Sequence, residues 1–225
     1  MSQLVVCSHG TRSGVGAARV SGLVSAVAAA LPSVDVCEAH VDVHPPFLDD
    51  VLTPGAVVVP LLLAAGYHVN VDIAAAASRA AASVTPTLGP DRMLTSVLSA
   101  RLGELEPDDV VVLAAAGSSV AGSDQATREV SRHLSFRLGR PVPVGYGAAS
   151  GPRLDDLVAG LRQTHPGRHV VAASYLLAPG HFYNRVLASG ADDVTDPLLD
   201  GETPDRRLVE LVVRRYLDHL LVAAV

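Results

Sequence analysis

The sequence contains no lysine, and all 17 of its basic residues are arginine, against 23 acidic residues and a formal net charge of −6. This acidic balance argues against nucleic acid as the main partner, because nucleic-acid binding needs a surplus of basic side chains. Cysteine is also scarce. The spacing of Cys7 and Cys37 matches neither a zinc nor a redox motif. We expect both to be buried free thiols in strands, as in a cytoplasmic protein.

Long apolar runs are missing as well, although 49% of the residues are hydrophobic. No run reaches the roughly 18 uncharged residues that a membrane helix needs. The first residues lead directly into a strand with no basic leader, so we expect no signal peptide. A length of 225 residues fits one large domain or two small ones.

Strand and helix patterns alternate along the chain, which predicts an α/β fold with parallel sheets. In the first half, apolar β-branched runs indicate strands at 4–8, 34–43, 56–63 and 84–87. Apolar residues at helical spacing between them indicate helices at 15–31, 47–52, 69–82 and 91–102. The second half restarts with a strand at 110–116, a helix at 123–138 and a strand at 142–147.

Several blocks of the first half return in the same order in the second. Pro46–Leu52 is echoed by Pro152–Val158, and Val84–Leu88 by Val194–Leu198. The sequence therefore predicts two duplicated βα domains, 1–105 and 106–225, each with a four-stranded parallel sheet flanked by helices. We expect a central cleft between them. An internal pseudo-dimer of this kind predicts a monomer.

Polar residues stand at the carboxyl ends of three strands in the first half, where ligands bind in open α/β sheets. His9 follows the first strand, Asp42 and His44 follow the second, and His68 follows the third. Two imidazoles and a carboxylate with open coordination positions suit a borderline divalent cation. In the second half we match His9 with Ala116, Asp42 with the region of Ala148, and His68 with His181, which leaves one histidine.

Each residue also has a structural interpretation. A histidine at a strand end can simply be hydrogen-bonded, and Asp42 can cap the next helix. His40 shares a strand face with Asp42 but lies deeper, and His44 can orient a neighbouring group. We interpret the remaining histidines as solvated and Ser118 and Ser119 as shaping a cavity; these histidines are His133, His165, His169 and His219.

Three stretches resemble the sirohydrochlorin chelatases, the class II tetrapyrrole chelatases related to cobaltochelatases and ferrochelatase. They are the opening Leu-Val-Val-Cys-Ser-His-Gly-Thr-Arg-Ser, the Val41-Asp42-Val43 ahead of Pro-Pro-Phe-Leu, and the Gly-Tyr-His-Val-Asn-Val-Asp-Ile at 66–73. The resemblance covers nearly the whole chain. His44-Pro45 departs from it, because relatives often carry a carboxylate there.

The resemblance implies insertion of Fe²⁺ or Co²⁺ into sirohydrochlorin, in sirohaem or cobalamin biosynthesis, with the metal as substrate and no tightly bound cofactor. It implies metal binding by His9 and His68, with His9, Asp42 and His68 as catalytic residues. Gly10, Arg12 and His181 are expected to contact the tetrapyrrole. Its carboxylates need donors, and the candidate arginines are Arg12, Arg79, Arg153 and Arg185.

Two other classes stay open. The protein could be a non-catalytic carrier of metal or tetrapyrrole, although the retention of all three polar residues argues against this. The His-Gly-Thr-Arg turn also resembles that of histidine phosphatases, but Ser8 precedes His9 and a second strand-end histidine is then unexplained. The sequence does not choose between iron and cobalt.

Overall fold

The computed structural model describes residues 2–64, 68–117, 124–148 and 151–223, without the side chains of 68–70 and 223. Ser118 and Ser119, to which we assigned a cavity-shaping role, lie outside these residues. The described chain contains two four-stranded sheets, with strand orders β2-β1-β3-β4 and β6-β5-β7-β8. All six strand pairings are parallel. The predicted fold class is therefore confirmed in its two parallel sheets; the central cleft stays a prediction.

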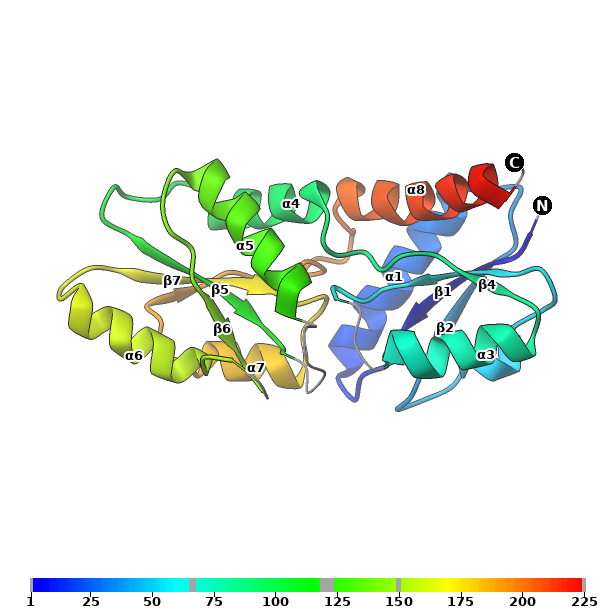
Figure 1. Cartoon of the computed structure of the whole chain (residues 1–225), viewed down its shortest axis with the longest axis horizontal. Coiled ribbons are helices and arrows are strands. Elements are labelled where there is room, and N and C mark those ends of the chain that lie inside the picture. The colour runs from blue at the N-terminus through cyan, green and yellow to red at the C-terminus, as the bar shows by residue number, and fades with distance from the viewer. Residues whose placement is uncertain (1, 65–67, 118–123, 149–150, 224–225) are drawn as a thin grey trace. The chain divides into compact units, whose positions relative to one another are not determined.

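The first sheet is built from short apolar strands, and its central strand is buried along its whole length. The strands are β1 (Leu4–Ser8), β2 (Val36–His40), β3 (Val57–Pro60) and β4 (Ser83–Val84). Helices α1 (Gly14–Ala30) and α8 (Arg206–Ala223) pack against each other, and they contact β2 and β3 respectively. Figure 1 shows the blue α1 and the red α8 side by side.

The opposite face of this sheet is covered by shorter helical segments. These are α2 (Leu48–Val51), the π-helix η1 (His68–Ile73) and α3 (Ala74–Arg79). Val5, Cys7 and Val58 form one core cluster with Leu48 and Ile73. Burying such side chains stabilises the fold by about 1.5–3 kcal/mol each.

The second sheet repeats this plan. Its strands are β5 (Val110–Ala115), β6 (Val144–Tyr146), β7 (Val170–Tyr175) and β8 (Asp193–Val194). Helices α4 (Arg92–Leu102) and α5 (Asp124–Leu138) pack against each other and contact β7 and β6. Helices α6 (Leu154–Thr164) and α7 (His181–Leu187) contribute Leu154, Val158 and Val186 to the core on the other face.

The chain divides into two compact units, 1–89 with 201–225, and 90–200. Helix α4 therefore belongs to the unit of the second sheet and α8 to that of the first, so each sequence half gives its last helix to the other unit. This division differs from the expected domains 1–105 and 106–225. The two compact units are defined by contacts and not by sequence repeats, so the boundary between repeats at position 105 stays a prediction.

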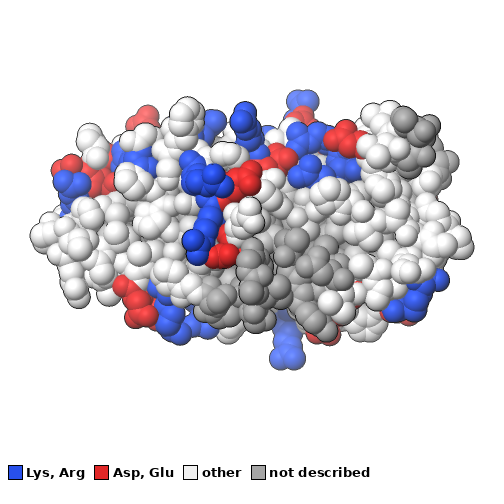
Figure 2. All heavy atoms as spheres, in the orientation of Figure 1, with Lys and Arg blue, Asp and Glu red and all other residues white. Residues whose placement is uncertain are grey.

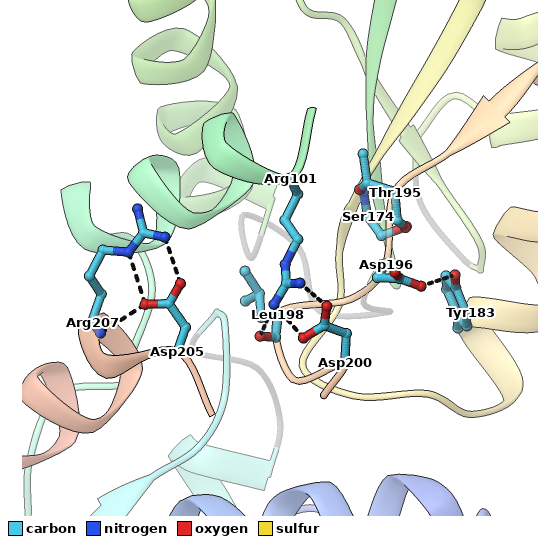
Figure 3. A network of polar contacts seen from close by, with 9 residues as sticks. All are labelled: Arg101, Ser174, Tyr183, Thr195, Asp196, Leu198, Asp200, Asp205 and Arg207. Atoms are coloured by element: carbon cyan, nitrogen blue, oxygen red, sulfur yellow. Dashed lines mark hydrogen bonds and ion pairs between the residues drawn. The ribbon is translucent and has the colours of Figure 1, made fainter. Parts of the chain in front are cut away.

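Arg101 and Arg215 occupy the same position in α4 and α8, the tenth residue of each helix. Each donates hydrogen bonds to backbone carbonyl groups close to a point where the chain passes from one unit to the other. On α8, Arg215 donates to the carbonyl oxygens of Thr87 (3.0 Å) and Leu88 (3.2 Å). On α4, Arg101 donates to the carbonyl oxygen of Leu198 (3.2 Å) and forms a two-pronged ion pair with Asp200 (Figure 3). These bonds satisfy carbonyl groups that follow the short strands β4 and β8.

The cysteine prediction is confirmed in part. Both cysteines are free and both lie in strands, but only Cys7 is fully buried; Cys37 on β2 is half-buried. Burial raises the pKa of the Cys7 thiol to about 12, so it stays protonated at neutral pH. Among the described residues, no helix combines the length and apolarity needed to cross a membrane.

Candidate active site

His9 is the first residue after β1, the strand that pairs with both β2 and β3. Its carbonyl oxygen accepts a hydrogen bond from the N–H of Asp42 at 3.0 Å, and the Ser8 carbonyl accepts from Val41 at 2.9 Å. Parallel pairing therefore continues for two residues beyond the end of β2. This pairing brings the predicted residues His9 and Asp42 to adjacent backbone positions at the carboxyl edge of the sheet.

The chain reverses immediately after Asp42 in a tight γ-turn. Val43 has a φ of 77°, and the N–H of His44 donates to the Asp42 carbonyl at 3.0 Å. Such a conformation in a β-branched residue costs about 1–3 kcal/mol and persists only where its surroundings hold it. The Asp42 carboxylate does so, because Oδ1 accepts from the Val43 N–H at 2.7 Å. Asp42 is therefore exposed but already engaged with its own turn.

Gly10 makes the close approach of the two loops possible. Its φ is +93°, and a Cβ atom there would lie 2.2 Å from the Asp42 carbonyl oxygen. No other residue type fits without moving that turn. The Gly10 N–H donates to Ser8 Oγ at 3.2 Å, so its expected role as a donor to the tetrapyrrole stays a prediction.

His40 is the last residue of β2, two positions before Asp42. It is buried, with 3% of its surface exposed. Its Nδ1 is 2.8 Å from Ser8 Oγ, and its Nε2 is 3.5 Å from a carboxylate oxygen of Glu38. Since Ser8 Oγ accepts from Gly10, its own proton is available to the imidazole. Burial, and then the neighbouring charge of His44, lower the pKa of His40, so this ring is neutral at neutral pH.

His44 folds back over His40 because of the γ-turn, with ring centroids 4.1 Å apart in an edge-on arrangement. Its Nδ1 is 3.0 Å from the Pro45 carbonyl oxygen, which can only accept, so Nδ1 carries the proton. Its Nε2 is buried and has no hydrogen-bond partner. His44 therefore packs beside the candidate site with one ring nitrogen that makes no hydrogen bond.

His68 is the first residue of the π-helix η1, which follows β3. π-Helical turns are rare and often found at functional sites. The side chain of His68 is not among those that the structure describes. The far end of η1 reaches the β2 side of the sheet: Val71 and Asp72 line a surface cavity of about 260 Å³ together with Val41 and Phe47.

No three His, Cys, Asp or Glu side chains converge into a metal site among the described residues, which do not include the His68 side chain. Two of the four candidate arginines for the tetrapyrrole carboxylates form ion pairs with aspartates. Arg79 pairs with Asp49 at 2.7 Å, and Arg153 pairs with Asp155 at 2.7 Å. Arg12 and Arg185 are exposed on the loop after β1 and on α7. Figure 2 shows basic and acidic side chains interspersed on the face that it presents.

The histidines interpreted as solvated do not all fit that description. His169 is 44% exposed, but it lies 3.2 Å from an Asp193 oxygen and 3.6 Å from an Asp109 oxygen. It lines a cavity of about 540 Å³ at the amino ends of β5, β7 and β8. Nδ1 of His133 is buried without a hydrogen bond. Neither residue lies at the carboxyl edge of its sheet.

The second sheet reproduces the backbone of the candidate site without its side chains. The N–H of Ala148 donates to the Ala116 carbonyl at 2.9 Å, as Asp42 does to His9. Gly117 has a φ of +86°, and a Cβ there would lie 2.1 Å from the Ala148 oxygen. The predicted matches of His9 with Ala116 and of Asp42 with Ala148 therefore agree with the hydrogen bonding.

The match of His68 with His181 is less direct. Leu88 donates to the Leu62 carbonyl and Leu198 donates to the Leu176 carbonyl, which pairs Leu62 with Leu176. Counting forward from this pair without a gap aligns Gly66 with Gly180 and Asn70 with Asn184. His68 then aligns with Phe182, and His181 with Tyr67. Both histidines nevertheless begin a helical segment, η1 and α7.

Two adjacent strands of the parallel first sheet therefore end in a histidine and a carboxylate at the same edge. Residues 3–105 match the family model described as CbiX. No curated protein sequence matches the chain.

Solved structures share the fold over nearly the full length. SirB from Bacillus subtilis with Fe³⁺ is 19% identical, with a TM-score of 0.76 and coverage of 97% of this chain and 95% of SirB. A cobalt complex of the sirohydrochlorin chelatase SirB from B. subtilis subspecies spizizenii is 17% identical, with a TM-score of 0.71 and the same coverages. CbiX, described as the terminal enzyme of sirohaem biosynthesis in denitrifying bacteria, is 17% identical, with a TM-score of 0.74 and coverages of 96% and 98%.

Proposed function

We propose that this protein is a sirohydrochlorin chelatase, which inserts Fe²⁺ or Co²⁺ into sirohydrochlorin as a step towards sirohaem or cobalamin. The observation that carries the proposal is the hydrogen-bonded pairing of His9 and Asp42 at the carboxyl edge of the first sheet, beside the strand that leads to His68. The equivalent backbone in the second unit carries alanines, so the chemistry belongs to one edge. The match to a CbiX family model over the same residues supports it.

Metal insertion requires a divalent ion that is held and then released. In our proposal His9 and His68 hold the ion through neutral imidazole nitrogens, which suit Fe²⁺ and Co²⁺ alike. Thiolates would hold the ion too firmly. Among the described residues the only sulfur close to His9 in sequence is Cys7, whose thiol is buried and has a raised pKa.

Insertion also releases two protons from the pyrrole nitrogens. Imidazole groups accept protons near neutral pH, because their pKa in solution is about 6.5. Asp42 would orient one imidazole or carry protons away from it. Its attachment to the γ-turn fixes the carboxylate, which favours a role in proton transfer over one in binding the tetrapyrrole.

The carboxylates of the tetrapyrrole require cationic partners. Arg12 is the stronger candidate in the first unit, because it is exposed three residues after His9, whereas Arg79 is neutralised by Asp49. His181 is expected to contribute less than His9, since it lacks an imidazole or carboxylate partner at the positions of Ala116 and Ala148.

The test is an absorbance time course of sirohydrochlorin with Fe²⁺ or Co²⁺, with and without the protein. A faster change to the spectrum of the metallated ring is expected with the protein. A carrier would instead bind the ring or the metal and leave the rate of insertion unchanged. Parallel runs with the two metals measure the metal preference.

A further inference from the structure

The second unit carries an exposed aromatic residue at the position that aligns with His68. Phe182 on α7 aligns with His68 when the repeats are counted from the hydrogen-bonded pair Leu62 and Leu176. The other two candidate residues align with Ala116 and Ala148. Where the first unit has imidazole, carboxylate and imidazole, the second has two methyl groups and a phenyl ring.

Helix α7 is anchored so that one face stays outward. Val186 is 1% exposed within the core of the second unit, and Tyr183 packs against the same cluster. The Tyr183 hydroxyl donates to Asp196 Oδ1 at 3.0 Å (Figure 3). Residues 181, 182 and 185 are nevertheless exposed, and residue 185 follows 182 by three positions and 181 by four, so the three side chains are neighbours on the helix surface.

The ring of Phe182 lies above Gly147, just beyond β6. A Cβ atom at Gly147 would approach Phe182 Cδ1 to 3.2 Å, so the glycine gives the ring its seat. The imidazole of His181 lies edge-on to the ring, with centroids 5.4 Å apart. Phe182 remains 36% exposed although its ring is held on two sides. An aromatic face that is fixed and open to solvent suits stacking on a flat ligand.

The charges of this surface fit an anionic ligand. Arg185, one helical turn from Phe182 and His181, is exposed. Helix α7 contains no acidic residue in its sequence HFYNRVL. A guanidinium beside an aromatic ring recognises a planar group that carries carboxylates at its rim.

We infer that the surface formed by His181, Phe182 and Arg185 is a docking platform for the tetrapyrrole, with Phe182 stacked on the macrocycle and Arg185 paired with a carboxylate. The inference rests on the proposed function and deepens it: the duplicated site has kept metal chemistry in one copy and become a ring-binding surface in the other. Metal binding itself does not require the platform.

The experiment measures the affinity for sirohydrochlorin without metal, by absorbance titration. Phe182→Ala should weaken binding about 10-fold, the size of a lost aromatic contact with its buried area. Arg185→Gln should weaken it less, and the loss should shrink as salt is added. The matched control is Phe136→Ala, because Phe136 is in the same unit, on α5, and is 91% exposed.

Phe182→Leu and calorimetric titration with Co²⁺ alone complete the design. Leu keeps apolar cover over Gly147 without an aromatic face, so it should fold and still bind the ring weakly. Co²⁺ affinity should equal that of the wild type in both Phe182 variants. Unchanged sirohydrochlorin affinity in Phe182→Ala or Phe182→Leu overturns the platform, whatever the insertion rate. A wild type that binds sirohydrochlorin through Phe182 but inserts no metal overturns the proposed chelatase activity and leaves the platform standing.

Discussion

The backbone N–H of Asp42 donates to the carbonyl oxygen of His9 at 3.0 Å, and this bond joins two strand ends of the candidate site. It extends the parallel pairing of β1 and β2 beyond the last residue of β2, into the loops that follow the two strands. The same bond exists between Ala148 and Ala116 in the second unit. The fold therefore supplies the same hydrogen-bonded frame twice, but only the first copy carries a histidine and a carboxylate on it.

Gly10→Ala should damage this frame. The new Cβ would meet the Asp42 carbonyl oxygen, in addition to the strain of a φ of +93°. The control is Gly55→Ala, where φ is +79° and nothing lies within 4 Å of the new atom. Gly55→Ala should cost about 1–2 kcal/mol of unfolding free energy, from the left-handed conformation alone. Gly10→Ala should cost more and also slow metal insertion; equal losses in denaturant unfolding would show that the two loops separate freely.

Asp42→Asn should reduce kcat for metal insertion more than it raises KM for sirohydrochlorin. The amide is the same size as the carboxylate and its oxygen can still accept from the Val43 N–H, so the γ-turn should survive. It cannot take up a proton, and losing a single acid–base group costs about 10²–10⁴-fold. Steady-state kinetics separate the two parameters. A change in KM alone would make Asp42 a positioning group for the substrate.

Arg12→Ala should raise KM for sirohydrochlorin, because an exposed guanidinium near His9 is lost. Arg79→Ala is the matched control: it also removes an exposed arginine of the first unit, but one already paired with Asp49. The Arg12 effect should diminish at high salt. Equal changes in KM for the two variants would contradict the assignment of Arg12 to the substrate.

His40 makes the stability of the first unit depend on pH. Its pKa is lowered from the ordinary 6.5, first by burial and then by His44. The unfolded chain therefore binds the proton more readily, and the contribution of His40 to stability is present above about pH 6.5 and lost as the pH falls. In His40→Phe the free energy of unfolding should fall less steeply as the pH is lowered through this range, because phenylalanine does not titrate. The substitution should be tolerated, since the equivalent position in the second unit holds the buried aromatic ring of Tyr146. Chemical denaturation of both proteins at several pH values measures the two slopes; identical slopes would contradict the assignment.

The strands and most helices were predictable because their apolar patterns are strong. The strand at 4–8 is β1 as predicted, and the helix predicted at 123–138 is confirmed over 124–138, the part of it that the structure describes. The π-helix was not predictable, since the apolar pattern of 69–82 does not distinguish η1 from a continuous α-helix. The exchange of α4 and α8 was missed for a similar reason: an apolar helix face shows that a helix packs, but not against which sheet.

The part of the candidate site that could be predicted is the set of residues that directly follow the strands. His9 and Asp42 were placed correctly at one sheet edge because parallel strands share an orientation. The strained turn at Val43 carries no signal in its residue type, since valine disfavours that conformation. The bond between Ser8 and His40 was also missed, although the two residues end paired strands in the same register. Phe182 was overlooked because a shared histidine suggested His181 as the partner of His68.

The most direct measurement is the initial rate of Co²⁺ insertion into sirohydrochlorin by the wild type, His9→Ala, His68→Ala and His219→Ala. His219 is a half-buried histidine of α8 in the same unit, away from the sheet edge, and its variant controls for the loss of an imidazole. His9→Ala and His68→Ala should each lose orders of magnitude in rate with the circular-dichroism spectrum unchanged, and His219→Ala should keep the wild-type rate. Near-wild-type insertion by either His9→Ala or His68→Ala would contradict the account.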